Sequence, residues 1–303
     1  MEELLSSFRK SMGASNSTEA DARSTGGLQL VRDALAERLT AGESSEELDV
    51  DLGVIDMLLK KLGKDTSRGQ QLHYTCRGLG DLDMRAVATL ANAEPAVIAS
   101  VTSINLSHNL IADTGVVALG KVLSGGAPAL LKIALHENKV GDEGLVALAA
   151  AMRPSGAPNI QVINLAFNRI EDTGIEALAT AFAEGGATAL RELHLAGNRI
   201  GDVGARRLFA QVHHAPRLLN LAFGSNTAGN LITDAVAHDV AQALASLGSR
   251  ESGQLILNLK NNKLTDAGEA ELTSMECDAL KVVAHGITAR PPTAAPSAAS
   301  YEA

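Results

Sequence analysis

The sequence predicts an α/β solenoid, with parallel strands on a concave face and helices on a convex face. Three observations support this fold class. A motif recurs about every thirty residues, and each copy passes from an alternating hydrophobic spacing to a spacing of three or four. Aromatic residues make up only 2% of the 303 residues, and there is no Trp. A core poor in aromatics must be built from Leu, Ile, Val and Ala, which suits many thin, similar layers.

The motif is clearest when four copies are aligned on an asparagine. Asn109, Asn138, Asn168 and Asn198 lie 29, 30 and 30 residues apart. Around each one, apolar residues fall at positions −8, −5, −3, +2 and +10, an aspartate at +4 and a glycine at +6. In the third copy these residues are Ile160, Ile163, Leu165, Ile170, Leu178, Asp172 and Gly174. Agreement at so many positions in four successive copies excludes a chance repeat.

Each copy contains a strand followed by a helix. The alternating apolar positions −5 and −3 predict a short strand, and the apolar spacing after the aspartate predicts an amphipathic helix. The aspartate is expected to be the N-cap of its own helix, where its carboxylate accepts from free amides of the first turn. The glycine two residues later is expected to allow neighbouring layers to approach closely.

Three further copies fit with defects. On the N-terminal side, Arg77 takes the asparagine position and Asp83 the glycine position. On the C-terminal side, one copy has Asn226 as its asparagine, four extra residues after it, and Val236 in place of the glycine. The last copy recovers the full pattern around Asn262. About seven repeats are therefore expected over residues 68–275.

The pattern L-x-x-L-x-L-x-x-N-x-I-x-D-x-G-x-x-x-L resembles the leucine-rich repeat, specifically its long ribonuclease-inhibitor-like subtype with a full helix per unit. Parallel strands stack at about 4.7 to 4.9 Å, whereas a helix is about 10 to 12 Å across, so the layers are expected to fan into a horseshoe. The asparagine turns the chain out of the strand, and its buried amide must bond to backbone. The expected structural asparagine ladder is Asn109, Asn138, Asn168, Asn198 and Asn262.

Both ends of such a stack need caps. The amphipathic segments "LQLVRDALAERLT" and "VIDMLLKKL" are candidates for the first cap, and "ALKVVAHGI" is a candidate terminal strand at the other end. Ser-rich and Ala/Pro-rich flanks predict disorder. The expected organisation is a disordered segment at 1–26, a helical N-terminal cap at 27–67, the repeats at 68–275, a C-terminal cap at 276–288 and a disordered tail at 289–303.

Composition narrows the function classes. The net charge of −9 argues against a nucleic-acid binder, which usually presents a basic face. Cys76 and Cys277 are the only cysteines, so a reducing compartment is expected. The start "MEELLSSFRK" is acidic where a targeting peptide is basic, and no apolar run is long enough to span a membrane. These features predict a cytoplasmic protein without membrane insertion.

Motifs for chemistry are absent from the sequence. There is no P-loop, H-E-x-x-H, C-x-x-C or G-x-S-x-G pattern. His73, His136 and His194 are each separated by an intervening layer, about 9 to 10 Å by strand spacing, which is too far for a shared metal ion. The sequence therefore predicts no enzyme activity, no cofactor and no metal site.

Partner binding is expected on the concave face. Strand residues at −6, −4 and −2 face the concavity, and this floor is small, polar and without aromatic anchors, so a tight interface is not indicated. After four of the asparagines the next residue is Lys or Arg, and these cations form a basic rim that can meet an acidic partner. The alternative is that these cations are solvated loop positions of little energetic weight. The candidate partner-binding residues are Asn105, His136, Asn164, His194 and Asn258 on the floor, and Lys139, Arg169, Arg199 and Lys263 on the rim.

Three functions are compatible with this surface. The first is a non-enzymatic protein–protein interaction scaffold, which the resemblance implies for most of the subtype. The second is a GTPase-activating protein similar to the Ran GTPase activator, although the Ala/Pro-rich tail departs from the acidic run of that family. The third is a structural subunit of a large cytoskeletal or axonemal assembly. The insertion at 224–230 is an alternative binding surface, and so are the convex helices.

Overall fold

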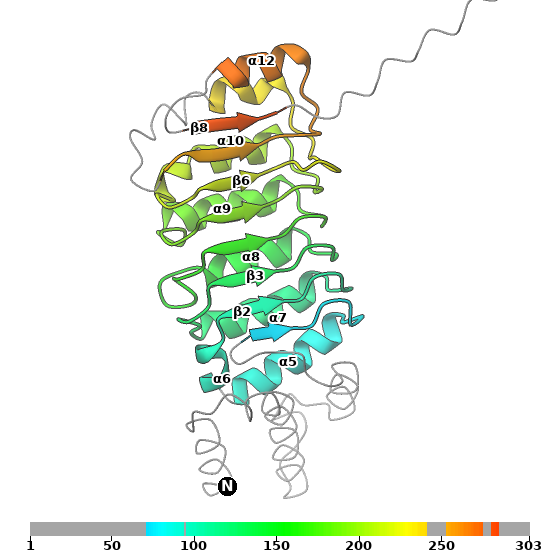
Figure 1. Ribbon diagram of the computed structural model, residues 1–303. Coiled ribbons are helices and arrows are strands. Elements are labelled where there is room, and N and C mark those ends of the chain that lie inside the picture. The colour runs from blue at the N-terminus through cyan, green and yellow to red at the C-terminus, as the bar shows by residue number, and fades with distance from the viewer. Residues whose placement is uncertain (1–70, 94, 241–252, 275–279, 285–303) are drawn as a thin grey trace, which may run out of the picture.

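The computed structural model describes residues 71–93, 95–240, 253–274 and 280–284. The predicted N-terminal segment 1–26, the helical cap 27–67 and the tail 289–303 lie outside the described residues. Figure 1 shows the described part as a single stack of layers, with strands on one face and helices on the other.

Eight short parallel strands form one open sheet in sequence order. They are β1 (Gln71–His73), β2 (Ser103–Asn105), β3 (Lys132–Ala134), β4 (Val162–Asn164), β5 (Glu192–His194), β6 (Asn220–Ala222), β7 (Leu255–Asn258) and β8 (Leu280–Val283). The strands pair in register, so that Leu72 of β1, Ile163 of β4 and Val282 of β8 occupy equivalent positions. β8 lies within the segment 279–287 for which a terminal strand was predicted.

Helices follow the strands and cover the other face of the sheet (Figure 1). They are α5 (Asp81–Ala93), α6 (Pro95–Ser100), α7 (Asp113–Ser124), α8 (Asp142–Ala151), α9 (Asp172–Ala183), α10 (Asp202–Phe209), η2 (Val212–His214), η3 (Asp234–Val236) and α12 (Asp266–Ser274). Each repeat is named below by its strand, so that β4 and α9 form the β4 repeat. The predicted fold class, an α/β solenoid with strands on the concave face and helices on the convex face, is confirmed.

The core lies between the two layers and is built from the repeated apolar positions. In the β4 repeat, Ile163, Leu165, Ile170 and Leu178 have no exposed surface. Burying each such side chain stabilises the fold by about 1.5 to 3 kcal/mol before conformational entropy is counted. Among the helices in the described part of the chain, none is both long and apolar enough to cross a membrane.

The asparagines bond across neighbouring repeats. The Oδ1 atom of Asn168 accepts from the amide of Val140 in the preceding repeat at 2.9 Å. Its Nδ2 atom donates to the carbonyls of Leu135, also in the preceding repeat, and Leu165, at 3.0 and 3.1 Å. The side chains of Asn109, Asn138, Asn198 and Asn262 make equivalent bonds. Each buried amide is therefore paired, as the cost of burying a polar group requires.

The aspartates do not cap their own helices, so that part of the sequence prediction is wrong. Asp113 is the first residue of α7, whose N-cap is Ala112. Its Oδ1 atom instead accepts from the amides of Gly141 and Gly144, at 2.6 and 2.9 Å, at the start of α8. The same forward bond joins Asp81 to Ala112, Asp142 to Glu171, Asp172 to Gly201, Asp202 to Thr233 and Asp234 to Thr265. Each aspartate supplies the N-terminal acceptor of the next helix in the stack.

The repeated glycine makes room for this carboxylate. A Cβ atom built on Gly174 would lie 2.7 Å from Oδ1 of Asp142 and 3.1 Å from its Cα atom. Equivalent clashes would arise at Gly144 and Gly204 with the aspartates of the preceding repeats. The aspartate at +4 and the glycine at +6 of the following repeat therefore form one structural unit.

The β6 repeat departs from the others at two positions. The asparagine position is filled by Asn230, which accepts from the amide of Ile200 at 3.0 Å and donates to the carbonyl of Phe223 at 2.7 Å. Asn226, which the sequence alignment placed there, is exposed. The four extra residues precede the structural asparagine and do not follow it. Because the pattern after the strand is otherwise unchanged, the position of the insertion was ambiguous in the sequence.

The β6 repeat lacks the glycine at position +6, and the aspartate of the preceding repeat bonds to a threonine there. Val236 occupies the glycine position in the 3₁₀ helix η3. Asp202 binds both the amide and the hydroxyl of Thr233 at 2.7 Å. The threonine hydroxyl thus supplies the second donor, which is a helix amide for Asp81 and Asp113, and Thr265 does the same for Asp234 in the β7 repeat.

Candidate protein-binding face

The strand register places four of the five predicted floor residues in one row, and His136 lies two residues beyond it, after β3. Asn105, Ala134, Asn164, His194, Ala222 and Asn258 are successive partners along the sheet. In each of the three asparagines, Oδ1 accepts from the backbone amide two residues later, namely Ser107, Ala166 or Lys260, at 3.1 to 3.2 Å. This bond fixes the side-chain amide and leaves its Nδ2 atom as the group that can donate to a partner.

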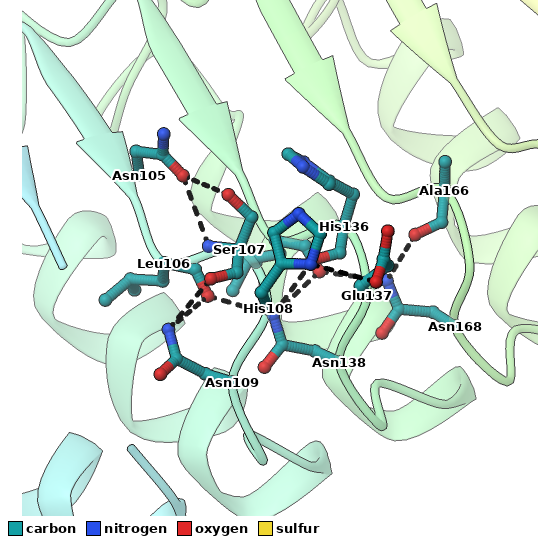
Figure 2. A network of polar contacts seen from close by, with 11 residues as sticks. Asn105, Leu106, Ser107, His108, Asn109, His136, Glu137, Asn138, Ala166 and Asn168 are labelled. Atoms are coloured by element: carbon teal, nitrogen blue, oxygen red, sulfur yellow. Dashed lines mark hydrogen bonds and ion pairs between the residues drawn. The ribbon is translucent and has the colours of Figure 1, made fainter. Parts of the chain in front are cut away.

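A histidine cluster lies at the end of β2 and β3 (Figure 2). The Nδ1 atom of His108 is 2.8 Å from Oε2 of Glu137. The rings of His108 and His136 meet edge to face, with centroids 5.0 Å apart. The Nδ1 atom of His136 is buried and has no hydrogen-bond partner. Burial lowers the pKa of His136, and the electrostatic effect of the neighbouring His108 lowers it further, while Glu137 opposes the shift.

The period-two pattern of the strands does not place His108 beside His136, because His108 is not at one of the alternate strand positions that face the floor. His108 stands one residue before the structural asparagine and has a left-handed backbone, with φ of 55°. His194 is paired separately, with Nε2 lying 3.1 Å from Oε2 of Glu192. Within the described ranges, no group of three or more His, Cys, Asp or Glu side chains is placed to hold a metal ion.

The predicted basic rim is exposed and its backbone is fixed. The amides of Lys139, Arg169, Arg199 and Lys263 donate to Ile111, Val140, Ile170 and Ile232 of the preceding repeats, at 2.8 to 2.9 Å. The four side chains project from the same position of four repeats. Leu110 and Leu231 occupy this position in the β2 and β6 repeats and are about half exposed, at 54% and 42%. The rim therefore combines cations with apolar side chains.

Phe167 is a surface residue that sequence reasoning did not identify. It lies one residue before the structural asparagine, with φ of 57°, and is 38% exposed. Three of its ring atoms lie 2.8 to 3.2 Å from the place where a Cβ atom on Gly197 would stand. The ring therefore covers Gly197 of the next repeat. An aromatic residue before the asparagine, in a chain with so few aromatics, was the signal that could have identified it.

The insertion at 224–230 folds over the β7 repeat. The amide of Ser225 donates to the carbonyl of Ala228 at 2.7 Å, which closes the turn. Asn261 donates to the carbonyl of Ser225 at 2.7 Å, and Lys260 donates to Oδ1 of Asn226 at 3.0 Å. The loop is thus tied to β7 by side chains, and Asn226 and Thr227 form its exposed tip.

Comparison with sequence families supports the repeat assignment. The leucine-rich repeat family matches residues 98–120, 130–149, 156–179 and 187–209, which contain the strands β2 to β5. The chain therefore carries leucine-rich repeats, and together with the sheet topology this defines it as a leucine-rich-repeat solenoid.

Among solved structures, the chain is similar to the crystal structure of an internalin from Listeria monocytogenes. The two share 15% sequence identity with a TM-score of 0.39, over 70% of this chain and 52% of the internalin chain. This chain thus spans about half the length of that internalin. The comparison with curated proteins gives no match.

Proposed function

We propose that this protein is a non-enzymatic scaffold that binds a protein partner through its strand face and the adjoining basic rim. Leucine-rich repeat proteins typically mediate protein–protein interactions, which supports this function. The observation that carries the proposal is the separation of two roles within each repeat. Buried asparagines and half-buried aspartates hold the repeats together, whereas Asn164, Arg169 and their counterparts project from a fixed backbone. A rigid surface loses little conformational entropy on binding.

The partner surface is proposed to be acidic. The rim presents Lys139, Arg169, Arg199 and Lys263 on a chain whose net charge is −9, so this edge differs in sign from the molecule as a whole. Complementary charges steer encounter and fix register more than they add affinity. Arg199 lies 3.4 Å from Glu171, and both side chains are more than half exposed, so solvent screens this pair and a partner can compete for the arginine.

The test is the double substitution Arg169→Glu and Arg199→Glu. A partner is first captured from cells with the full chain and identified by mass spectrometry, and its dissociation constant is then measured with purified proteins. We expect the double variant to bind about ten-fold or more weakly and with a flatter salt dependence, while its thermal unfolding stays nearly unchanged. Arg153→Glu with Arg217→Glu is the matched control. These exposed arginines precede β4 and β6, on the side of the sheet where the strands begin, whereas the rim lies where the strands end.

An unchanged dissociation constant in the rim variant would contradict this assignment. The binding surface would then be sought on the convex helices or on the 224–230 insertion. Equal weakening by the control pair would show a general effect of net charge and would equally contradict a role for this rim.

Three finer assignments accompany this function. We infer the ribonuclease-inhibitor-like subtype, which the 29- and 30-residue spacing and the 12-residue helices α7 and α9 support. The helical cap at 27–67 is proposed to cover the β1 end, where Leu72 is only partly buried although its counterparts in β2 to β8 are buried. A cytoplasmic location is proposed from the low cysteine content.

A further inference from the structure

We propose that the rim between the β3 and β5 repeats binds an acidic segment of the partner that carries a bulky apolar side chain, with Phe167 as the anchor. This inference rests on the proposed function and narrows it to one contact. The residues of this Phe167 rim site are Lys139, Phe167, Arg169, Gly197 and Arg199.

Phe167 is held in place while part of its ring stays in solvent. Its backbone amide donates to the carbonyl of Ala196 at 2.7 Å, which ties the residue to the next repeat. Its ring packs over Gly197, and 38% of the residue is exposed. An aromatic side chain has few rotatable bonds, so a ring already packed on one side loses little entropy when a partner covers the other.

Gly197 serves this ring and is not required by the backbone alone. Its φ is 70°, in the left-handed region. Five other residues hold the same position with φ of 55° to 57°, and none of them is glycine: Cys76, His108, Glu137, Phe167 and Asn261. A side chain is therefore tolerated by this backbone in other repeats. At residue 197 it would occupy the space of the Phe167 ring.

Cations outnumber carboxylates at the rim around Phe167 once the repeat aspartates, whose Oδ1 atoms accept backbone amides of the next repeat, are set aside. Its own repeat and the two adjoining ones contribute Lys139, Arg169 and Arg199 to the rim, and the carboxylates Glu137 and Glu171. Glu137 is bound to His108, and Glu171 is within 3.4 Å of Arg199. Lys139 and Arg169 form no ion pair within the part of the chain that the structure describes. These two cations are free to meet carboxylates of a partner.

The aromatic ring and the neighbouring cations together indicate which kind of partner segment binds here. Aromatic and arginine side chains carry most of the energy in protein interfaces, and they do so where they pair with an anchor on the partner. An exposed ring next to two unpaired cations fits an apolar side chain flanked by Asp or Glu. A single-stranded nucleic acid would also stack on an aromatic ring beside cations, and it is treated as an alternative in the test.

The test uses a phage-displayed library of random 12-residue peptides, selected against the full chain. Selected peptides are synthesised with a fluorescent label, and their dissociation constants are measured by anisotropy. We expect them to be rich in Asp and Glu around one bulky apolar residue. Phe167→Asn should weaken their binding about ten-fold or more, since Asn keeps the left-handed backbone, as Asn261 does in the β7 repeat. Arg169→Glu should weaken binding to a similar degree.

Matched controls separate the anchor from general rim effects. Leu231→Asn removes another exposed apolar residue of the rim, in the β6 repeat, and is expected to change binding less than about two-fold. Arg153→Glu makes the same charge change outside the rim. Gly197→Ala keeps Phe167 in the chain but places a methyl group against its ring, and should weaken the same peptides several-fold.

Several outcomes would overturn the Phe167 rim site. They are equal effects of Phe167→Asn and Leu231→Asn, a selection that yields no acidic peptide above background, or Phe167-dependent binding of a 20-nucleotide single-stranded RNA that is tighter than that of the selected peptides. Loss of the cellular partner on Arg169→Glu and Arg199→Glu, with no effect of Phe167→Asn, would refute this inference and leave the proposed function standing.

Discussion

At the residue scale, two side chains per repeat form hydrogen bonds to the neighbouring layers. Asp142 reaches forward to the amide of Glu171 at 2.8 Å, and Asn168 reaches back to the amide of Val140 at 2.9 Å. A charged or buried acceptor that loses its donor costs about 1 to 3 kcal/mol. The glycine at position +6 is part of the same device, because it leaves the space that the carboxylate fills.

The pairing of Asp142 with Gly174 predicts non-additive stabilities. Gly174→Ala alone should destabilise by about 1 to 3 kcal/mol, because its Cβ atom meets the carboxylate of Asp142 at 2.7 Å. Asp142→Ala alone should cost about 0.5 to 2 kcal/mol through the lost helix acceptor. With both changes, the alanine at 174 should cost less, since the 2.7 Å contact with the carboxylate is gone and Ala favours helix, and only the 3.1 Å contact with the Cα atom of residue 142 remains. Urea denaturation of the four proteins measures this coupling, and strictly additive values would contradict the pairing.

His136 predicts a component of stability that depends on pH. Its pKa in the folded protein is lowered, first by burial and then by the electrostatic effect of His108, with a smaller opposing effect of Glu137 and smaller reinforcing effects of Lys132 and His194. The unfolded chain therefore binds this proton more readily. Stability from this residue is fully present above about pH 6.5 and is lost as the pH falls through the lowered folded pKa.

The corresponding measurement compares urea midpoints between about pH 7.5 and about pH 5.5. His136→Gln should lose less stability over this range than the parent protein, because the group that takes up the proton is gone. His238→Gln, at an exposed histidine, serves as the control and should follow the parent. Identical pH profiles for the parent and His136→Gln would refute the linkage.

At the element scale, the sequence predicts the strand and helix of each repeat well, because two hydrophobic periods alternate within one unit. The period also gives the order of the parallel strands, since neighbouring units must stack. The direction of the aspartate bond was not predictable, because a carboxylate at a helix start can serve its own helix or the next one equally well by sequence. The choice depends on the spacing of layers, which only the coordinates supply.

The insertion in the β6 repeat predicts a tolerated deletion. Removing Ser225–Ala228 joins Gly224 to Gly229 and restores the spacing between Leu221 and Asn230 to that of the other repeats. The losses are the side-chain bonds from Lys260 and Asn261, both made near the surface. We expect a folded protein whose free energy of unfolding changes by about 1 kcal/mol or less. Urea denaturation and circular dichroism check this outcome.

A second deletion gives the contrast. Removing Arg153–Gly156 shortens the turn between α8 and β4, where the carbonyl of Gly156 accepts from Ala127 of the preceding repeat at 2.8 Å. This deletion should destabilise the fold far more than the first. If both deletions were equally damaging, the β6 insertion would have to be an integral part of the repeat.

At the scale of the whole molecule, the structure is a linear stack in which each repeat contacts its neighbours. Such stacks open from their ends, because a terminal layer has one interface and a central layer has two. Three equivalent strand-end amides sample this difference. Tyr74 donates to Asn105 near the first strand, Leu165 to His194 in the middle and Leu259 to Val283 at the last strand.

Hydrogen exchange is expected to follow this order. The amide of Leu165 should exchange more slowly than those of Tyr74 and Leu259 by about a factor of ten or more, measured in the intact protein by mass spectrometry or NMR. Equal protection at all three positions would show that the solenoid opens only as one unit.

The candidate site could be predicted only in part, and the reason is geometric. The exposed cations Lys139, Arg169 and Arg199 follow directly from their place after the asparagine. Phe167 and His108 were not predicted. Both have a left-handed backbone conformation just after the strand, outside the alternating positions that face the floor. A period-two rule describes a strand but stops applying where the chain leaves it.

Each aspartate bonds to the next repeat and each asparagine bonds to the preceding repeat, and this arrangement affects how repeat number can change in evolution. Because both partners of these bonds recur once in every repeat, unequal recombination that adds or removes one entire repeat leaves donors and acceptors matched. A change by a fraction of a period survives only where it falls outside these bonds, as the four residues of the β6 insertion do. Descendants of this chain can therefore vary in length by whole units, each of which adds another segment of floor and rim on which selection can act.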